Sequence, residues 1–186
     1  PNPIKPTQNA PTMTNLVHFT NCRLAVFHPT NKNKQDGDGL CRMDLLVDAD
    51  QGTIVQLFDE CAAAPAAKVI DCGGNILSPG FIDVQINGYL GVDFSDASTI
   101  TAEGVRTVAR KIVATGVTSF CPTLISCSAE EYAHILPILG PLCGEKGRRR
   151  GAGDNNNNGA NILGLHLEGP FFAPSKAGAH PMQHIL

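Results

Sequence analysis

The sequence predicts an α/β fold, in which a small N-terminal β-domain precedes a series of parallel strand–helix units. Short β-rich runs separated by turn-like stretches fill the first part of the chain, and strand-like and helix-like segments alternate after Gly80. Such alternation is typical of parallel βαβ units. Polar residues also recur at the ends of the later strands. We therefore expect a disordered tail at 1–14, a β-domain at 15–79 and an α/β domain at 80–186.

The expected β-domain contains three short strands. Residues 16–26, 43–49 and 53–58 are rich in β-branched and aliphatic residues, and the stretches NKNKQDGDG and ADQG between them are typical of turns. The segment before them holds four prolines within its first eleven positions, which disfavours packing against a core. The tail at 1–14 is therefore predicted to be disordered.

The expected α/β domain alternates strands and helices in chain order. Strands are predicted at 81–87, 117–125 and 161–168, and helices at about 101–115 and 129–139. The Gly-, Arg- and Asn-rich stretch before the last strand, from 144 to 161, is predicted to be a solvated loop.

Both helices carry recognisable end signals. Thr101 is an N-cap residue for the first helix, and Gly116 ends it. The apolar residues between them recur at helical spacing: Val105, Val108, Ala109 and Ile112. Ser128 and Glu131 have the spacing of a capping box, which predicts the start of the second helix.

Composition excludes several functional classes. Fourteen basic and seventeen acidic side chains give a net charge of -3, and aromatic residues make up only 5%, so nucleic acid is not an expected partner. No apolar stretch reaches the roughly 18 residues of a membrane span and no leader pattern opens the chain, so we expect a cytoplasmic protein without a membrane partner. The seven cysteines lack any CxxC pair, which favours free thiols over a zinc knuckle, the alternative.

The stretch ILGLHLEGPFF at 162–172 places ionisable residues in an apolar strand. Because side chains alternate along a strand, His166 and Glu168 share the face opposite the leucines. Gln85 and Asn87 are placed in the same way near the end of the strand at 81–87. Helices cover both faces of a doubly wound sheet, whereas in a barrel such residues line the interior. The alternative is that Asp83, Gln85 and His166 are hydrogen-bonded core residues.

Three motifs carry a family resemblance. LSPGFIDVQINGYLGVDF at 77–94, GVTSFCPTL at 116–124, and LGLHLEGPFF at 163–172 followed by KAGAHP at 176–181 resemble the N-terminal part of the N-acetylglucosamine-6-phosphate deacetylases, members of the amidohydrolase superfamily. The resemblance implies an incomplete (β/α)8 TIM-type barrel of about three βα units with a small N-terminal β-domain. It also implies hydrolysis of the acetamide of N-acetylglucosamine 6-phosphate to glucosamine 6-phosphate and acetate.

The resemblance further assigns a metal site. Glu168 matches the metal-binding glutamate of the family. Gln85-Ile86-Asn87 stands where many superfamily members have His-x-His, and amides are poor zinc ligands beside imidazole or carboxylate, so one divalent metal ion is expected. Zinc is the expected ion, with iron or another divalent metal as alternatives. His166 is expected to support the site, together with Gln85 and Asn87, rather than to bind the metal.

Other functional residues are expected in the loop after Glu168 and outside this chain. Ala179 and His180 match positions that contact the sugar substrate in the family. Two metal-binding histidines and the catalytic aspartate are expected beyond Leu186, so no catalytic acid or base is expected within the chain. A typical barrel has about 250 residues. We therefore expect a truncated chain that is inactive alone and a homo-oligomer when full length.

Three alternatives remain open at this point. His166, Glu168, His180 and His184 form a self-contained metal site if the last two share a helix face. A related enzyme would act on another N-acyl sugar or on a cyclic amide. A non-catalytic product would instead bind a partner through the open edge of its sheet.

Overall fold

The computed structural model describes residues 15–25, 40–58, 68–144 and 159–186. These residues belong to two compact units that meet in sequence between Pro79 and Gly80. The predicted tail at 1–14, the turn-like stretch NKNKQDGDG and most of the predicted loop at 144–161 lie outside the described residues. Within the described ranges, no helix is both long and apolar enough to cross a membrane.

The first unit is a five-stranded mixed sheet. Its strands are β1 (Leu16–Leu24), β2 (Cys41–Asp48), β3 (Thr53–Phe58), β4 (Lys68–Asp71) and β5 (Ile76–Leu77). β2 pairs antiparallel with β1 and β3, whereas β4 and β5 both run parallel to β1. The three predicted strands are confirmed; β4 and β5 were missed because a run of two to four residues is too short to show alternation.

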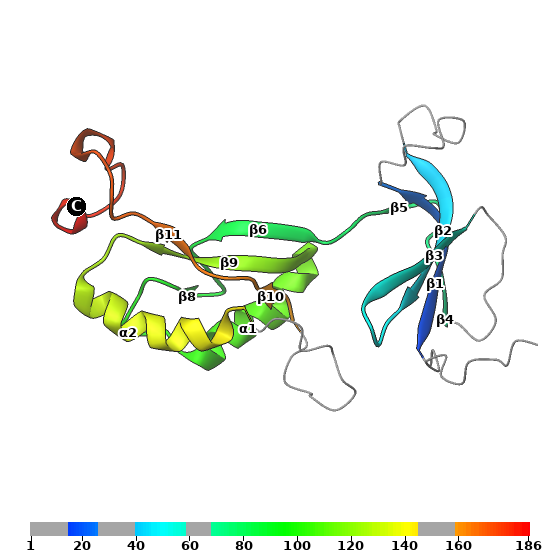
Figure 1. The fold of residues 1–186 in the computed structure, drawn as a ribbon, viewed down its shortest axis with the longest axis horizontal. Coiled ribbons are helices and arrows are strands. Elements are labelled where there is room, and N and C mark those ends of the chain that lie inside the picture. Colours follow the sequence, from blue (N-terminus) through cyan, green and yellow to red (C-terminus); the bar gives the residue numbers. More distant parts are fainter. Residues whose placement is uncertain (1–14, 26–39, 59–67, 145–158) are drawn as a thin grey trace, which may run out of the picture. The chain divides into compact units, whose positions relative to one another are not determined.

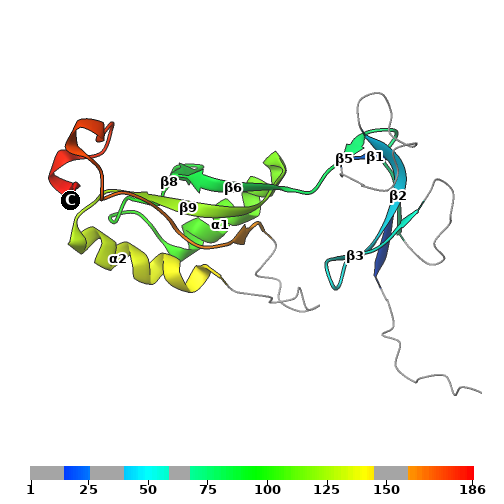
Figure 2. The ribbon, with the colours of Figure 1, turned by 45° about the horizontal axis from the view of Figure 1, so that its top comes forward.

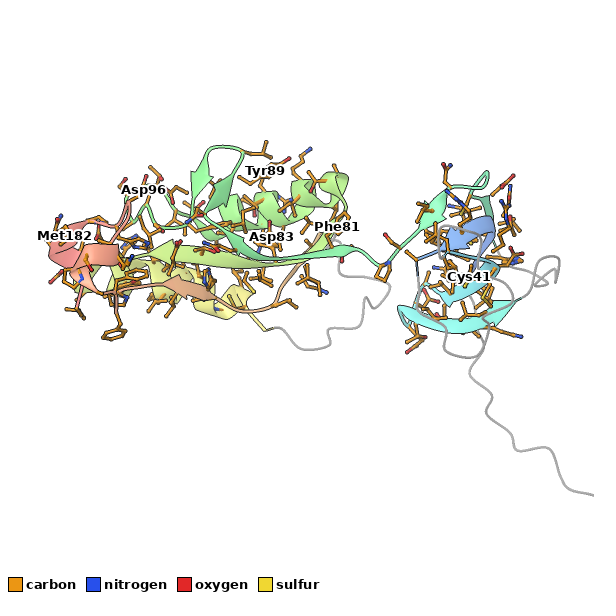
Figure 3. The ribbon with its side chains drawn as sticks, turned by 90° about the horizontal axis from the view of Figure 1, so that it is seen from above. Cys41, Phe81, Asp83, Tyr89, Asp96 and Met182 are labelled. Carbon is orange, nitrogen blue, oxygen red and sulfur yellow. The ribbon has the colours of Figure 1, made fainter. Side chains whose placement is uncertain are left out.

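A small core stabilises this sheet. Cys22 and Leu24 from β1 and Cys41 and Met43 from β2 are buried together, and Figure 3 shows Cys41 within this unit. Cys22 and Cys41 are free thiols, as are the four other cysteines of the described segments. Cys22 and Cys41 therefore act as small apolar core residues.

The second unit has a parallel sheet with β9 at its centre. β6 (Phe81–Ile86) pairs parallel with one side of β9 (Val117–Ile125), and β10 (Asn161–Ile162) and β11 (His166–Glu168) pair parallel with the other. The predicted strand at 161–168 is thus two short strands, separated by a segment that contains Gly164, which has no side chain to pack. The prediction of a mixed α/β fold is confirmed, and the described strands form no closed barrel.

Among the described residues, the remaining elements of this unit are two helices, four 3-10 turns and a short antiparallel strand pair. The helices are α1 (Ala102–Ile112) and α2 (Ala129–Leu139), each followed by a 3-10 turn, η1 (Val113–Thr115) and η2 (Gly140–Leu142). β7 (Gly88–Tyr89) and β8 (Val92–Asp93) form an antiparallel pair after β6. Two more 3-10 turns, η3 (Pro174–Lys176) and η4 (Met182–His184), lie in the C-terminal segment.

Both helices pack on one face of this sheet. Phe120 and Leu124 of β9 are fully buried in a core with apolar residues from α1 and α2, namely Val105, Val108, Ala109, Ile112, Ile135 and Leu139. Figures 1 and 2 both show the two helices on the same side of β9. Since side chains alternate along a strand, Thr123 and Ile125 point to the face opposite the helices.

The helix ends follow the sequence signals. The Thr101 hydroxyl accepts a hydrogen bond from the Gly104 N–H at 3.0 Å, and Gly116 adopts the left-handed conformation with φ of 85°. The Ser128 hydroxyl accepts from the Glu131 N–H at 3.2 Å, and the Glu131 carboxylate accepts from the Ser128 N–H at 2.7 Å. This second bond, above all, lowers the pKa of Glu131. Its stabilising contribution is therefore present above the ordinary carboxyl range and is lost as the pH falls through the lowered pKa.

Substitution of Ser128 by alanine tests the capping box. We expect Ser128→Ala to lower the free energy of unfolding by about 1 kcal/mol at neutral pH, because the Glu131 N–H loses its acceptor. Urea unfolding followed by circular dichroism measures this difference. Ser175→Ala, at an exposed position of η3, is the matched control and should change stability far less. Equal stability of the two variants would contradict the capping role.

Candidate metal and substrate site

The carboxyl ends of three parallel strands meet at one edge of the second sheet. β6, β9 and β11 end at Ile86, Ile125 and Glu168, respectively. Ligands of parallel α/β proteins gather at this kind of edge. A candidate site therefore lies at this edge, where the sequence also places polar residues at the ends of strands.

The strand register determines which side chains share the open face. In β11, His166 pairs with Thr123 and Glu168 pairs with Ile125, and these β9 residues point away from the helices. Neighbouring residues of paired parallel strands lie on the same face. His166 and Glu168 therefore lie on the face opposite α1 and α2.

Gln85 and Asn87 reach the same face from β6. Ile86 pairs with Pro122 and packs against the helix-side core, so its two neighbours in sequence lie on the open side. Gln85 and Asn87 are both exposed, and β9 separates their strand from β11. Gln85 is thus not a buried core residue. The carboxylate of Asp83 accepts a hydrogen bond from the Gln85 N–H at 3.1 Å.

Glu168 and His180 are brought together by the loop that follows β11. The Glu168 Oε1 atom lies 3.5 Å from His180 Nε2, and the two side chains are 31% and 10% exposed, respectively. The His180 N–H donates to the Ala177 carbonyl at 3.0 Å, which holds the turn after η3. The neighbouring Ala179 is exposed.

Thr123 in β9 and Ser126 just after it contact the two histidines, and neither was predicted from the sequence. The Thr123 hydroxyl lies 3.1 Å from His166 Nδ1, and Thr123 is fully buried. Ser126 lies 3.0 Å through its hydroxyl and 3.2 Å through its N–H from His180 Nδ1. Their position at the carboxyl end of a parallel strand was the signal available in the sequence.

The four-residue local metal site does not form. His184 lies in η4 near Glu131: after the larger effect of Ser128, His184 also lowers the pKa of Glu131. His166 instead contacts Thr123. Among the described residues, no group of three or more His, Cys, Asp or Glu side chains is placed to hold a metal ion. This alternative is therefore wrong for the chain as folded here.

Glu168 can supply only one of the ligands that a single divalent ion needs. A carboxylate is a suitable ligand for zinc and for other divalent ions, and Glu168 is exposed enough to accept one. A catalytic zinc normally takes three protein ligands. The described residues supply one carboxylate in this position, so a complete site needs ligands from elsewhere.

Comparison with known proteins shows close relatives by sequence. The chain is 43% identical over 174 residues to N-acetylglucosamine-6-phosphate deacetylase of Bos taurus and 42% identical over 174 residues to that of Homo sapiens. In both cases the match covers 91% of this chain but only 36% of the relative. The chain thus spans about a third of these relatives' length. No protein-family model matches it.

Comparison with solved structures shows the fold. A crystal structure of N-acetylglucosamine-6-phosphate deacetylase from Pasteurella multocida matches with a TM-score of 0.64 at 24% identity, over 92% of this chain and 38% of that one. The chain therefore shares the α/β fold of that solved structure over the residues that match. By sequence, the chain is homologous to the N-acetylglucosamine-6-phosphate deacetylases over the stretch that it spans. The resemblance carried by the three sequence motifs is confirmed.

Proposed function

We propose that the chain is part of an N-acetylglucosamine-6-phosphate deacetylase, in which β6, β9 and β11 are the first strands of a (β/α)8 barrel. The proposed reaction hydrolyses the acetamide of the phosphorylated sugar to glucosamine 6-phosphate and acetate. One observation carries the proposal. The carboxylate of Glu168 lies on the open face of the carboxyl edge, beside His180, within a sequence that is 43% identical to a deacetylase.

The residues on this face have distinct proposed roles. Glu168 would hold one divalent ion, which we propose is zinc, with iron or another divalent metal as alternatives. When bound, such an ion activates water and polarises a carbonyl group. His180 presents Nε2 to the same space and would hydrogen-bond the sugar substrate, next to Ala179. Gln85 and Asn87 would line the site from β6.

His166 would support the site rather than bind the metal ion. Its Nδ1 atom lies beside the buried Thr123 hydroxyl, which fixes the ring on the open face of the sheet. The catalytic aspartate and two further metal ligands are proposed to lie beyond Leu186. The homo-oligomer and the cytoplasmic location stay predictions.

Two forms of the protein test the proposed function. The purified chain of 186 residues should release no measurable acetate from N-acetylglucosamine 6-phosphate, because one carboxylate cannot supply the ligands that a catalytic zinc needs. A hybrid in which this chain replaces the similar segment of the bovine relative should release acetate, and a chelator should abolish that activity.

The same assay separates the alternatives. Metal-dependent turnover by the chain alone would contradict the need for further ligands, and a folded hybrid without activity would contradict the proposed function. Faster hydrolysis of another N-acyl sugar or of a cyclic amide by the hybrid would favour the related enzymes. The unaltered bovine enzyme is the control for the assay.

A further inference from the structure

Ser126 contacts one atom of His180 in two ways. Its backbone N–H and its hydroxyl lie 3.2 Å and 3.0 Å, respectively, from His180 Nδ1. Ser126 is 1% exposed and follows the end of β9, so its backbone is held by the sheet. The two residues are 54 positions apart, and the contact exists only in the folded chain.

The backbone N–H decides which ring nitrogen carries the proton. A backbone N–H can only donate a hydrogen bond, so His180 Nδ1 must be the unprotonated acceptor. In a neutral imidazole the hydrogen then sits on the other nitrogen, Nε2. That atom lies 3.5 Å from Glu168 Oε1, just beyond ordinary hydrogen-bond distance.

This arrangement limits the chemistry of His180. A neutral ring with hydrogen on Nε2 has no lone pair there for a metal ion, but it can donate a hydrogen bond to an oxygen atom. His166 differs, because its Nδ1 contacts the Thr123 hydroxyl, which can donate or accept. His166 and His180 therefore have different constraints.

Neighbouring residues hold the ring in this orientation. The rings of Phe172 and His180 have their centroids 4.6 Å apart at an interplanar angle of 55°. Gly169 lies next to the Ser126 hydroxyl, where a Cβ atom would lie 2.1 Å from Ser126 Oγ. The ring is thus fixed at Nδ1 by Ser126 and along one face by Phe172.

We infer that Ser126 is a positioning residue, which holds His180 with Nδ1 as acceptor and directs its Nε2–H toward the space beside Glu168. The hydroxyl adds a second donor to the one that the backbone supplies. The tautomer follows from geometry alone, whereas its effect on turnover rests on the proposed function. The two parts therefore need separate measurements.

The tautomer is measured by NMR on the chain labelled with 15N-histidine, in the absence of metal and substrate. Ring nitrogen shifts distinguish protonated from unprotonated nitrogens, and the His180→Gln variant identifies the signals of His180 among those of the six histidines. We expect the neutral ring to have an unprotonated Nδ1 and a protonated Nε2. A neutral ring protonated at Nδ1 would overturn the inference whatever the activity.

The positioning role is measured by kinetics on the hybrid. Ser126→Ala keeps the backbone donor but loses the hydroxyl, so we expect kcat to fall about tenfold with little change in KM, because misplacing a group in a site by about 1 Å can cost about 100-fold in rate. Ser119→Ala replaces a half-buried serine of β9 away from the carboxyl edge and should leave both kcat and KM unchanged.

The outcomes are distinguishable from a failure of the proposed function. An unchanged kcat in Ser126→Ala would overturn the positioning role, even if the hybrid is fully active. An inactive hybrid would reject the proposed function, while the NMR result would still decide the tautomer of His180.

Discussion

Replacement of Glu168 by glutamine is expected to lower kcat of the hybrid by roughly a hundredfold or more. Loss of an outer-shell partner of a metal ligand already costs about 10- to 100-fold, and Glu168 is the proposed ligand itself. Glutamine keeps the shape of the side chain but removes its charge, and amides bind zinc poorly. The assay is acetate release at saturating metal and substrate, and bound metal is measured by elemental analysis of the dialysed hybrid.

The control for Glu168→Gln removes the same charge elsewhere in this unit. Glu130 is exposed in the first turn of α2 and lies outside the capping box, so Glu130→Gln should retain activity and metal content. Circular dichroism should show both variants folded, because Glu168 is only partly buried. Full activity of Glu168→Gln would reject the proposed metal site on this chain.

Substitution of Gly169 by alanine is expected to lower the free energy of unfolding by about 3 kcal/mol. Gly169 has φ of +104°, which L-residues rarely adopt, and a Cβ atom there would lie 2.1 Å from Ser126 Oγ and 2.8 Å from a ring carbon of Phe172. Backbone strain and overpacking each cost about 1–3 kcal/mol. Ser126 is buried and its hydroxyl contacts His180 Nδ1, so moving Oγ aside would break that contact.

Gly91 provides the matched control for this substitution. It has φ of +81°, but a Cβ atom there would meet nothing within 4 Å. Gly91→Ala should therefore cost only the left-handed backbone penalty of about 1–2 kcal/mol. Urea unfolding of both variants measures the difference. Equal losses would show that the contact with Ser126 does not constrain Gly169.

Several elements could be predicted from the sequence because their signals are local. α2 begins at Ala129 and ends at Leu139, as predicted, since Ser128 and Glu131 form their hydrogen bonds within one turn. β9 also has its predicted bounds, because a run of nine residues leaves a clear pattern between Gly116 and Ser128. The strand predicted at 161–168 was too long, since pairing with β9 is interrupted in its middle.

The sequence by itself determined the order of the longer strands and the two helices, the helix caps and the face on which His166 and Glu168 lie, because each depends on the spacing of neighbouring residues. Only the tertiary structure decided that Ser126 and Glu168 meet the same imidazole from opposite sides. His180 follows Ser126 by 54 positions, and no local pattern encodes that pairing. Such contacts form only when β9 and β11 pair and the loop after β11 folds back over their ends.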